Sequence, residues 1–139
     1  MKFKYKVNGT TTEYIGTGNK YEAIIPEKIG GIPASYIGVK AFSLNRLTKI
    51  RIPNSVTSID DSAFYYNRLT NIQIPKSVTH IGNRAFSFNN LTNIQIPNSI
   101  ISINSNTFRD NKLTNIRIPN SVKSIGECAF YNNTLTNLV

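Results

Sequence analysis

The stretch IPNSVTSIDDSAFYYNRLTNIQ, residues 52–73, decides the fold, because the chain repeats it with small changes every 22 residues. The dipeptide Ile-Pro begins at positions 52, 74, 96 and 118, and an earlier copy begins 27 residues upstream, at position 25. Three further sets of residues keep the same period through five turns: Phe42, Phe64, Phe86, Phe108 and Phe130; Asn45, Asn67, Asn89, Asn111 and Asn133; and Leu47, Leu69, Leu91, Leu113 and Leu135. Such a period is typical of a solenoid, in which each unit packs against its neighbours.

One unit cannot bury its own apolar face, whereas stacked units align equivalent side chains into continuous columns. Around Ile50 and Ile52, apolar and polar residues alternate, which predicts a strand. Pro53 ends this strand because proline has no N–H to donate. The stretch from Val56 to Ile59 predicts a second, short extended or turn segment on the way back.

The phenylalanines are expected to form one buried spine, and the asparagines to satisfy backbone groups where the chain turns into the strand. A ladder of exposed, ligand-binding asparagines is the alternative. Gly82 and Gly126 follow the second segment, where Asp60 and Asn104 stand in other turns. This choice of residues predicts a turn with a positive φ at that position.

Residues 1–24 depart from the repeat and predict a β cap on the solenoid, which occupies residues 25–139 of a single domain. Apolar residues alternate with lysines over residues 2–7, and Asn8-Gly9 follows them, a dipeptide typical of tight hairpins. Residues 11–15 and 21–25 predict two more strands. The chain ends inside the strand of its last turn, so we expect a weak homodimer through residues 131–139, since exposed strand edges pair readily. A monomer with a frayed last turn is the alternative.

The motif Ile-Pro-x-Ser-Val-x-x-Ile-Gly-x-x-Ala-Phe-x-x-Asn-x-Leu-Thr resembles the BspA-like, or treponemal-type, leucine-rich repeat over about residues 24–139. Residues 25–42 resemble the longer opening repeat of that family, whereas asparagine stands where that family often has cysteine, and the unit is one residue shorter than its common form. We therefore predict a right-handed leucine-rich-repeat solenoid, mostly parallel β with turns and little helix. It would contain about five 22-residue turns and an N-terminal β-hairpin cap.

The resemblance implies a non-catalytic binding module for protein–protein interaction or adhesion, as in bacterial surface proteins. Its partner would be a protein or extracellular-matrix ligand, and its location the cell surface or the secreted fraction. The first residues lack the apolar run of a secretory signal, which leaves a cytoplasmic location open. The net charge of +9 favours an anionic partner, so a basic polyanion- or nucleic-acid-binding module is the alternative.

Residues able to support catalysis are sparse and occupy variable positions of the repeat. His80, the single histidine, stands where Ser58 and Ser102 stand in other turns. Cys128 is the single cysteine, which excludes a disulfide within the chain and a cysteine-based zinc site, and its variable position predicts exposure. The sequence also contains no run of 18 apolar residues and no glycine-rich phosphate loop. We expect no catalytic residues, no metal, no cofactor and no small-molecule substrate.

The outward positions of the strand and those just before it carry six positive charges and no acid over the repeats. We expect these positions to form the concave strand face, with candidate binding residues Arg46, Lys49, Arg51, Arg68, Asn71, Gln73, Asn93, Gln95, Lys112, Asn115 and Arg117. One interpretation is a solvated sheet that charge and amides keep from aggregating. The other is a binding face for an acidic partner.

A second set of candidates lies on the opposite ridge, where aromatic residues recur in equivalent positions. They are Tyr65, Tyr66, Phe88 and Tyr131, with Leu44 nearby. Exposed aromatic side chains at repeated positions can form an adhesive stripe. They can equally cover the edge of the core between turns, and the sequence does not distinguish the two.

Overall fold

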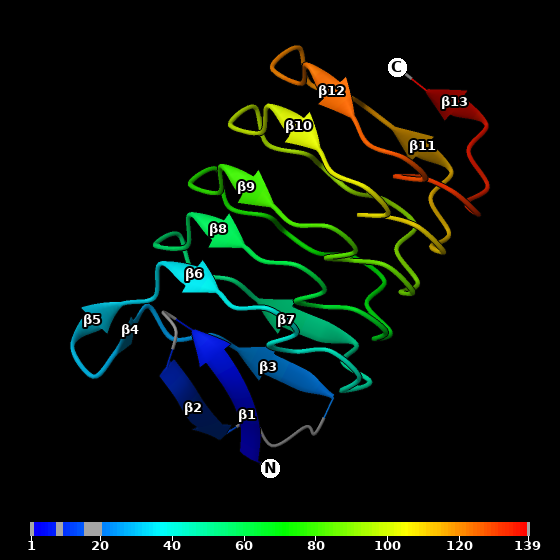
Figure 1. The fold of residues 1–139 in the computed structure, drawn as a ribbon. Coiled ribbons are helices and arrows are strands. Elements are labelled where there is room, and N and C mark those ends of the chain that lie inside the picture. Colours follow the sequence, from blue (N-terminus) through cyan, green and yellow to red (C-terminus); the bar gives the residue numbers. More distant parts are fainter. Residues whose placement is uncertain (1, 8–9, 16–20, 139) are drawn as a thin grey trace.

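The computed structural model describes residues 2–7, 10–15 and 21–138, which form a stack of turns built from short strands (Figure 1). The strands of successive turns fall in two columns, and those that pair within these columns run parallel. The first strand column contains β3 (Glu22–Ile24), β7 (Lys49–Arg51), β11 (Asn115–Ile116) and β13 (Asn137–Leu138). The second contains β6 (Tyr36–Ile37), β8 (Ser58–Ile59), β9 (His80–Ile81), β10 (Ser102–Ile103) and β12 (Ser124–Ile125). Nothing in this described part is helical, and so it offers no helix that could cross a membrane.

The second column is more regular than the first. The sequence, in contrast, predicted a strand in the first column and only a short extended or turn segment in the second. The stretch around Ile50 and Ile52 was expected to be the main strand, yet residues 71–73 form no strand and the next turn contributes only a bridge between Gln95 and Arg117. The segment predicted as extended or turn forms a two-residue strand in five turns. The little-helix, short parallel-strand architecture is thus confirmed, while the handedness of the solenoid stays a prediction.

An antiparallel pair of strands near the N-terminus extends the second column. β1 (Lys2–Val7) pairs antiparallel with β2 (Thr10–Ile15), and Val7 pairs with Ile37 of β6. The resulting sheet has the order β2-β1-β6-β8-β9. The hairpin prediction is confirmed, although its Asn8-Gly9 turn lies outside the described residues. β3 joins the first column as a parallel neighbour of β7, as expected of a strand near residues 21–25.

The five additional residues of the first unit form a small projection at one corner of the turn. β4 (Lys28–Ile29) and β5 (Ile32–Pro33) pair antiparallel around Gly30 and Gly31, which have φ values of 59° and 80°. Positive φ at both central residues suits a two-residue hairpin turn, and glycine adopts it without steric cost. The projection leaves the stack undisturbed, because β3 and β7 still pair in register across 27 residues.

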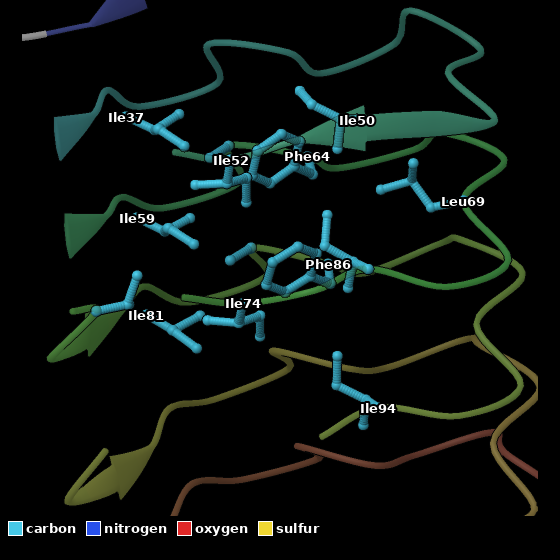
Figure 2. Packing of buried hydrophobic residues seen from close by; sticks show 14 of the residues in the cluster. Ile37, Ile50, Ile52, Ile59, Phe64, Leu69, Ile74, Ile81, Phe86 and Ile94 are labelled. Atoms are coloured by element: carbon cyan, nitrogen blue, oxygen red, sulfur yellow. The ribbon is translucent and has the colours of Figure 1, made fainter. Parts of the chain in front are cut away.

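The core between the columns is a spine of stacked phenylalanine rings, as predicted. Ring centroids of neighbouring turns lie 5.3–5.7 Å apart with interplanar angles of 3–9°. Phe42, Phe64, Phe86 and Phe108 are at most 1% exposed, whereas Phe130 in the last turn is partly buried. Figure 2 shows Phe64 and Phe86 among the isoleucines that both columns contribute.

The asparagines beside this spine link its turns through hydrogen bonds, which confirms their structural role. Asn89 Nδ2 donates to the carbonyl oxygens of Phe64 and Phe86, at 3.0 and 3.1 Å, and its Oδ1 accepts from Leu69 N at 3.1 Å. Asn67, Asn111 and Asn133 repeat this pattern one turn at a time. Each phenylalanine carbonyl between two such turns therefore accepts from two asparagines.

The backbone on the phenylalanine side forms a third connection between turns. Alternate N–H groups donate to the carbonyl of the next turn, as Lys40 N to Asp61 O, Phe42 N to Ala63 O and Leu44 N to Tyr65 O, at 2.7–3.0 Å. Two non-glycine positions of each turn have φ of 55–60°: Lys40, Ser62, Arg84, Asn106 and Cys128, and then Leu44, Tyr66, Phe88, Asp110 and Asn132. Such a conformation costs a non-glycine residue about 1 kcal/mol.

The predicted positive φ at Gly82 and Gly126 is wrong, because the left-handed residues lie two positions later. These glycines are required by a close approach of backbones instead. A Cβ at Gly82 would lie 2.5 Å from Asp61 N and 2.7 Å from Asp60 C, and one at Gly126 would meet the preceding turn in the same way.

Candidate functional site

The strand face presents all eleven predicted binding residues to solvent. Each of them is exposed, and each lies beside an apolar residue of the core, because side chains alternate along the extended segment. The parallel register aligns equivalent positions directly, with Asn115 beside Asn137 and Gln95 beside Arg117. The structure thus places these side chains in continuous columns on one surface, which we call the strand face.

The strand face carries Arg46, Arg68 and Lys112 along one column and Lys49, Arg51 and Arg117 along the next two. None of these six cations forms an ion pair that the structure records within its described residues. Their positive charge is therefore available to a ligand.

The structure places an acidic residue on this face that the alignment of the 22-residue repeats did not reveal. Glu22 of β3 lies in register with Lys49, and the half-exposed Ile24 lies beside Arg51. The first unit is five residues longer than the others, so a search at a period of 22 stops at Lys49. The strand predicted for residues 21–25 was the feature of the sequence that could have placed Glu22 on this face. The cationic surface consequently begins at the second turn of this column.

The aromatic ridge combines both interpretations that the sequence left open. Tyr65 is half-buried and packs against Tyr66 and Phe88, with ring centroids 5.9 and 5.6 Å apart. Leu44, Tyr66 and Phe88 are exposed by 67%, 54% and 37%, and the rings of Tyr66 and Phe88 stack at 5.6 Å. Tyr65 thus packs against its two aromatic neighbours, while Leu44, Tyr66 and Phe88 form an exposed apolar line.

The ridge changes character in the last two turns. Arg109 lies 5.0 Å from the ring centroid of Tyr131 and forms an ion pair with Asp110, with 2.9 Å between Nε and Oδ2. Asn132 Nδ2 also donates to Asp110. Asp110 and Asn132 occupy the positions of Leu44, Tyr66 and Phe88 in earlier turns, so the apolar line ends there.

A shallow hollow runs across four successive turns and is lined by residues 39–40, 61–62, 83–84 and 105–106. Its polar groups already serve the stack: Asp61 Oδ1 accepts from Asn83 N at 2.8 Å, and Asn83 Oδ1 accepts from Ser105 N at 3.1 Å. Lys40 and Arg84 add charge to its wall. Because these acceptors are occupied by the backbone, the hollow offers little to a specific ligand.

The residues considered for catalysis lie apart from one another. His80 is exposed on β9, and Cys128 is an exposed free thiol in the turn after β12, as its variable position predicted. Over the described ranges, no three histidine, cysteine, aspartate or glutamate residues come close enough to hold a metal ion.

Comparison with solved structures gives matches among bacterial repeat proteins. A leucine-rich repeat protein of T. pallidum is 28% identical, with a TM-score of 0.80 over 98% of this chain and 67% of its own. The pneumococcal vaccine antigen PcpA is 21% identical, with a TM-score of 0.67 over 90% and 40%. A leucine-rich cell surface protein of Faecalibacterium prausnitzii is 24% identical, with a TM-score of 0.50 over 99% and 54%. The chain thus spans between two fifths and two thirds of these proteins.

No curated protein matches the chain in sequence. The model of the BspA-type leucine-rich repeat region, in contrast, matches residues 25–139 in six copies, which is most of the chain and the whole of the repeat described above. The chain belongs to the family of BspA-type leucine-rich repeat regions.

Proposed function

We propose that this chain is a non-catalytic interaction module whose strand face binds an acidic surface of a protein or extracellular-matrix ligand. The observation that carries the proposal is the alignment of six exposed cations and five exposed amides in columns on a stack of turns, which pair in parallel at β3–β7, at β11–β13 and between Gln95 and Arg117. The backbone beneath these side chains is already ordered, so binding needs to order the side chains alone, which favours recognition. Complementary charge adds specificity and speeds association.

The setting that we propose is the bacterial cell surface or the secreted fraction. One protein with this fold is described as a leucine-rich cell surface protein, and another as a vaccine antigen. Their repeats use the same scaffold, and a scaffold alone does not determine a ligand. The choice of an acidic ligand therefore rests on the charges of this chain.

The test replaces Lys49, Arg51 and Arg117 together with glutamine and measures binding to immobilised poly-L-glutamate at near-physiological salt. The three side chains point to solvent, so the variant should fold normally, and its affinity should fall roughly tenfold. A matched control replaces Lys28, Lys76 and Lys123, which are exposed elsewhere and remove the same charge. Equal losses in the two variants would show attraction by net charge alone and would contradict a site on the strand face.

The alternative, a polyanion- or nucleic-acid-binding module, is favoured by the net charge of +9. If the six strand-face cations contacted phosphates, the logarithm of the affinity for duplex DNA would fall with the logarithm of salt with a slope of about −5. Binding to DNA that is tighter than to poly-L-glutamate, with such a slope, would support this alternative over the protein ligand.

A further inference from the structure

The apolar line of Leu44, Tyr66 and Phe88 places bulky side chains where the backbone disfavours them. Their φ values are 60°, 58° and 57°, in the left-handed region that suits glycine, asparagine and aspartate. The same position holds Asp110 and Asn132 in the next two turns, so the fold accepts the residues that this conformation prefers. The three apolar side chains are therefore not required by the local backbone.

Packing of the hydrophobic core does not require them either, because none of the three belongs to the core cluster, although Phe88 packs on Tyr65 and Tyr66. The left-handed conformation accompanies backbone bonds to the next turn, such as Tyr66 N to Ser87 O at 3.0 Å and Phe88 N to Arg109 O at 3.0 Å. Any residue other than proline supplies that N–H. More than half of the surface of Leu44 and of Tyr66 stays exposed, and Phe88 is 37% exposed. An exposed aromatic line kept against the preference of the backbone indicates a surface with a partner.

A cationic column runs beside this apolar line. Arg46 and Arg68 stand two residues after Leu44 and Tyr66, which limits the separation of their Cα atoms to about 7 Å. The residue between Tyr66 and Arg68 is Asn67, which is buried and fixed to two phenylalanine carbonyls. Apolar and cationic side chains thus lie in two neighbouring columns held by the same rigid turn.

We propose that Leu44, Tyr66 and Phe88 form, with Arg46 and Arg68, a two-column docking surface for an acidic protein segment that carries apolar side chains. This inference rests on the proposed function and assigns part of its ligand chemistry. The partner's apolar residues pack on the aromatic line, and its carboxylates pair with the two guanidinium groups, which suit carboxylates through their planar donors. Tyrosine and arginine are the residues that dominate the energy of many protein interfaces.

The shape of the surface favours a polypeptide over a lipid bilayer. The apolar line is one side chain wide, and stacking at 5.6 Å between Tyr66 and Phe88 fixes its pitch. Three turns therefore span roughly the length of four extended residues, at about 3.3 Å each. A narrow line of this length fits an extended segment, whereas a membrane would contact a plane of apolar side chains.

The experiment replaces Leu44, Tyr66 and Phe88 together with asparagine, the residue that position 132 already holds. The probe is a fluorescent ten-residue peptide of glutamates interspersed with leucine and phenylalanine, with a peptide of glutamates and serines as its control. Affinity is measured by fluorescence anisotropy, and stability by thermal unfolding. We expect the variant to bind the apolar peptide at least tenfold more weakly, to bind the serine peptide as before, and to unfold at an unchanged or higher temperature.

Three results would overturn the inference. A variant that unfolds at a lower temperature yet binds as before would show that the line only covers the core. Equal affinity of the unchanged protein for the two peptides would show that apolar residues contribute nothing. Binding to vesicles containing phosphatidylserine that depends on the three residues, without binding to the peptide, would assign the surface to a membrane. The glutamine variant of Lys49, Arg51 and Arg117 tests the strand face separately, so its response identifies which of the two proposals fails.

Discussion

Replacing Asn89 with alanine tests how the turns are joined, and its cost follows from the hydrogen bonds of the side chain. Asn89 is 6% exposed and makes three bonds of 3.0–3.1 Å, to Phe64 O, Phe86 O and Leu69 N, and a longer one of 3.4 Å to Ser87 O, which keeps Tyr66 N as a second donor. The two phenylalanine carbonyls also keep a second donor, because Asn67 Nδ2 reaches Phe64 O at 3.1 Å and Asn111 Nδ2 reaches Phe86 O at 2.9 Å.

The loss therefore consists mainly of two replaceable bonds and one unsatisfied group. Each lost bond to a carbonyl that keeps a partner costs about 0.5–1.5 kcal/mol, and the buried Leu69 N–H without an acceptor costs about 1–3 kcal/mol. We expect Asn89→Ala to lower the free energy of unfolding by roughly 2–6 kcal/mol. The exposed Asn93, replaced in the same way, should change it by less than about 0.5 kcal/mol.

A double-mutant cycle sharpens this prediction. Replacing both Asn89 and Asn111 removes both donors to Phe86 O, so the pair should cost about 1–2 kcal/mol more than the sum of the single changes. Asn89 and Asn133 share no carbonyl, so that pair should be additive. Urea unfolding followed by circular dichroism measures all six proteins. Additivity in both pairs would refute the idea that neighbouring asparagines support a common acceptor.

Two further predictions concern packing. Phe86→Ala should lower the free energy of unfolding by about 3–5 kcal/mol, and a loss below about 1 kcal/mol would mean that the spine is not buried. Gly82→Ala should lower the free energy of unfolding by about 1–3 kcal/mol, because the new methyl group meets the backbone of the preceding turn. Asp60→Ala, at the equivalent position, adds no atom and should lower it less.

The repeat was predictable from the sequence because residues that stack on each other in the fold are separated by the constant spacing of one unit. The columns of Phe86, Asn89 and Leu91 keep a spacing of 22, and each column in the fold stacks side chains of one type. The exposure of the strand face followed from alternation around Ile50. These features depend on which residue stands where in the unit, and the sequence contains that information directly.

The features that the sequence did not reveal depend on backbone conformation. The left-handed residues were expected at Gly82, the position with a glycine, and were found instead at Arg84 and Phe88, whose side chains give no such indication. The hydrogen bonds of the whole stack enforce that conformation against residue preference. Glu22 escaped notice for another reason, since the longer first unit places it out of phase with the columns.

The small hairpin of β4 and β5 has a consequence for what this scaffold can accommodate. Residues 27–33 replace the two residues 54–55 of a regular turn, yet the strands on either side keep their partners. This corner therefore tolerates a change of length without transmitting it to the stack. The equivalent corners at residues 76–77, 98–99 and 120–121 likewise follow an Ile-Pro pair and precede a valine or isoleucine. Foreign loops grafted there, such as an epitope or a recognition peptide, would be displayed in a row along one rim, at the spacing of the turns.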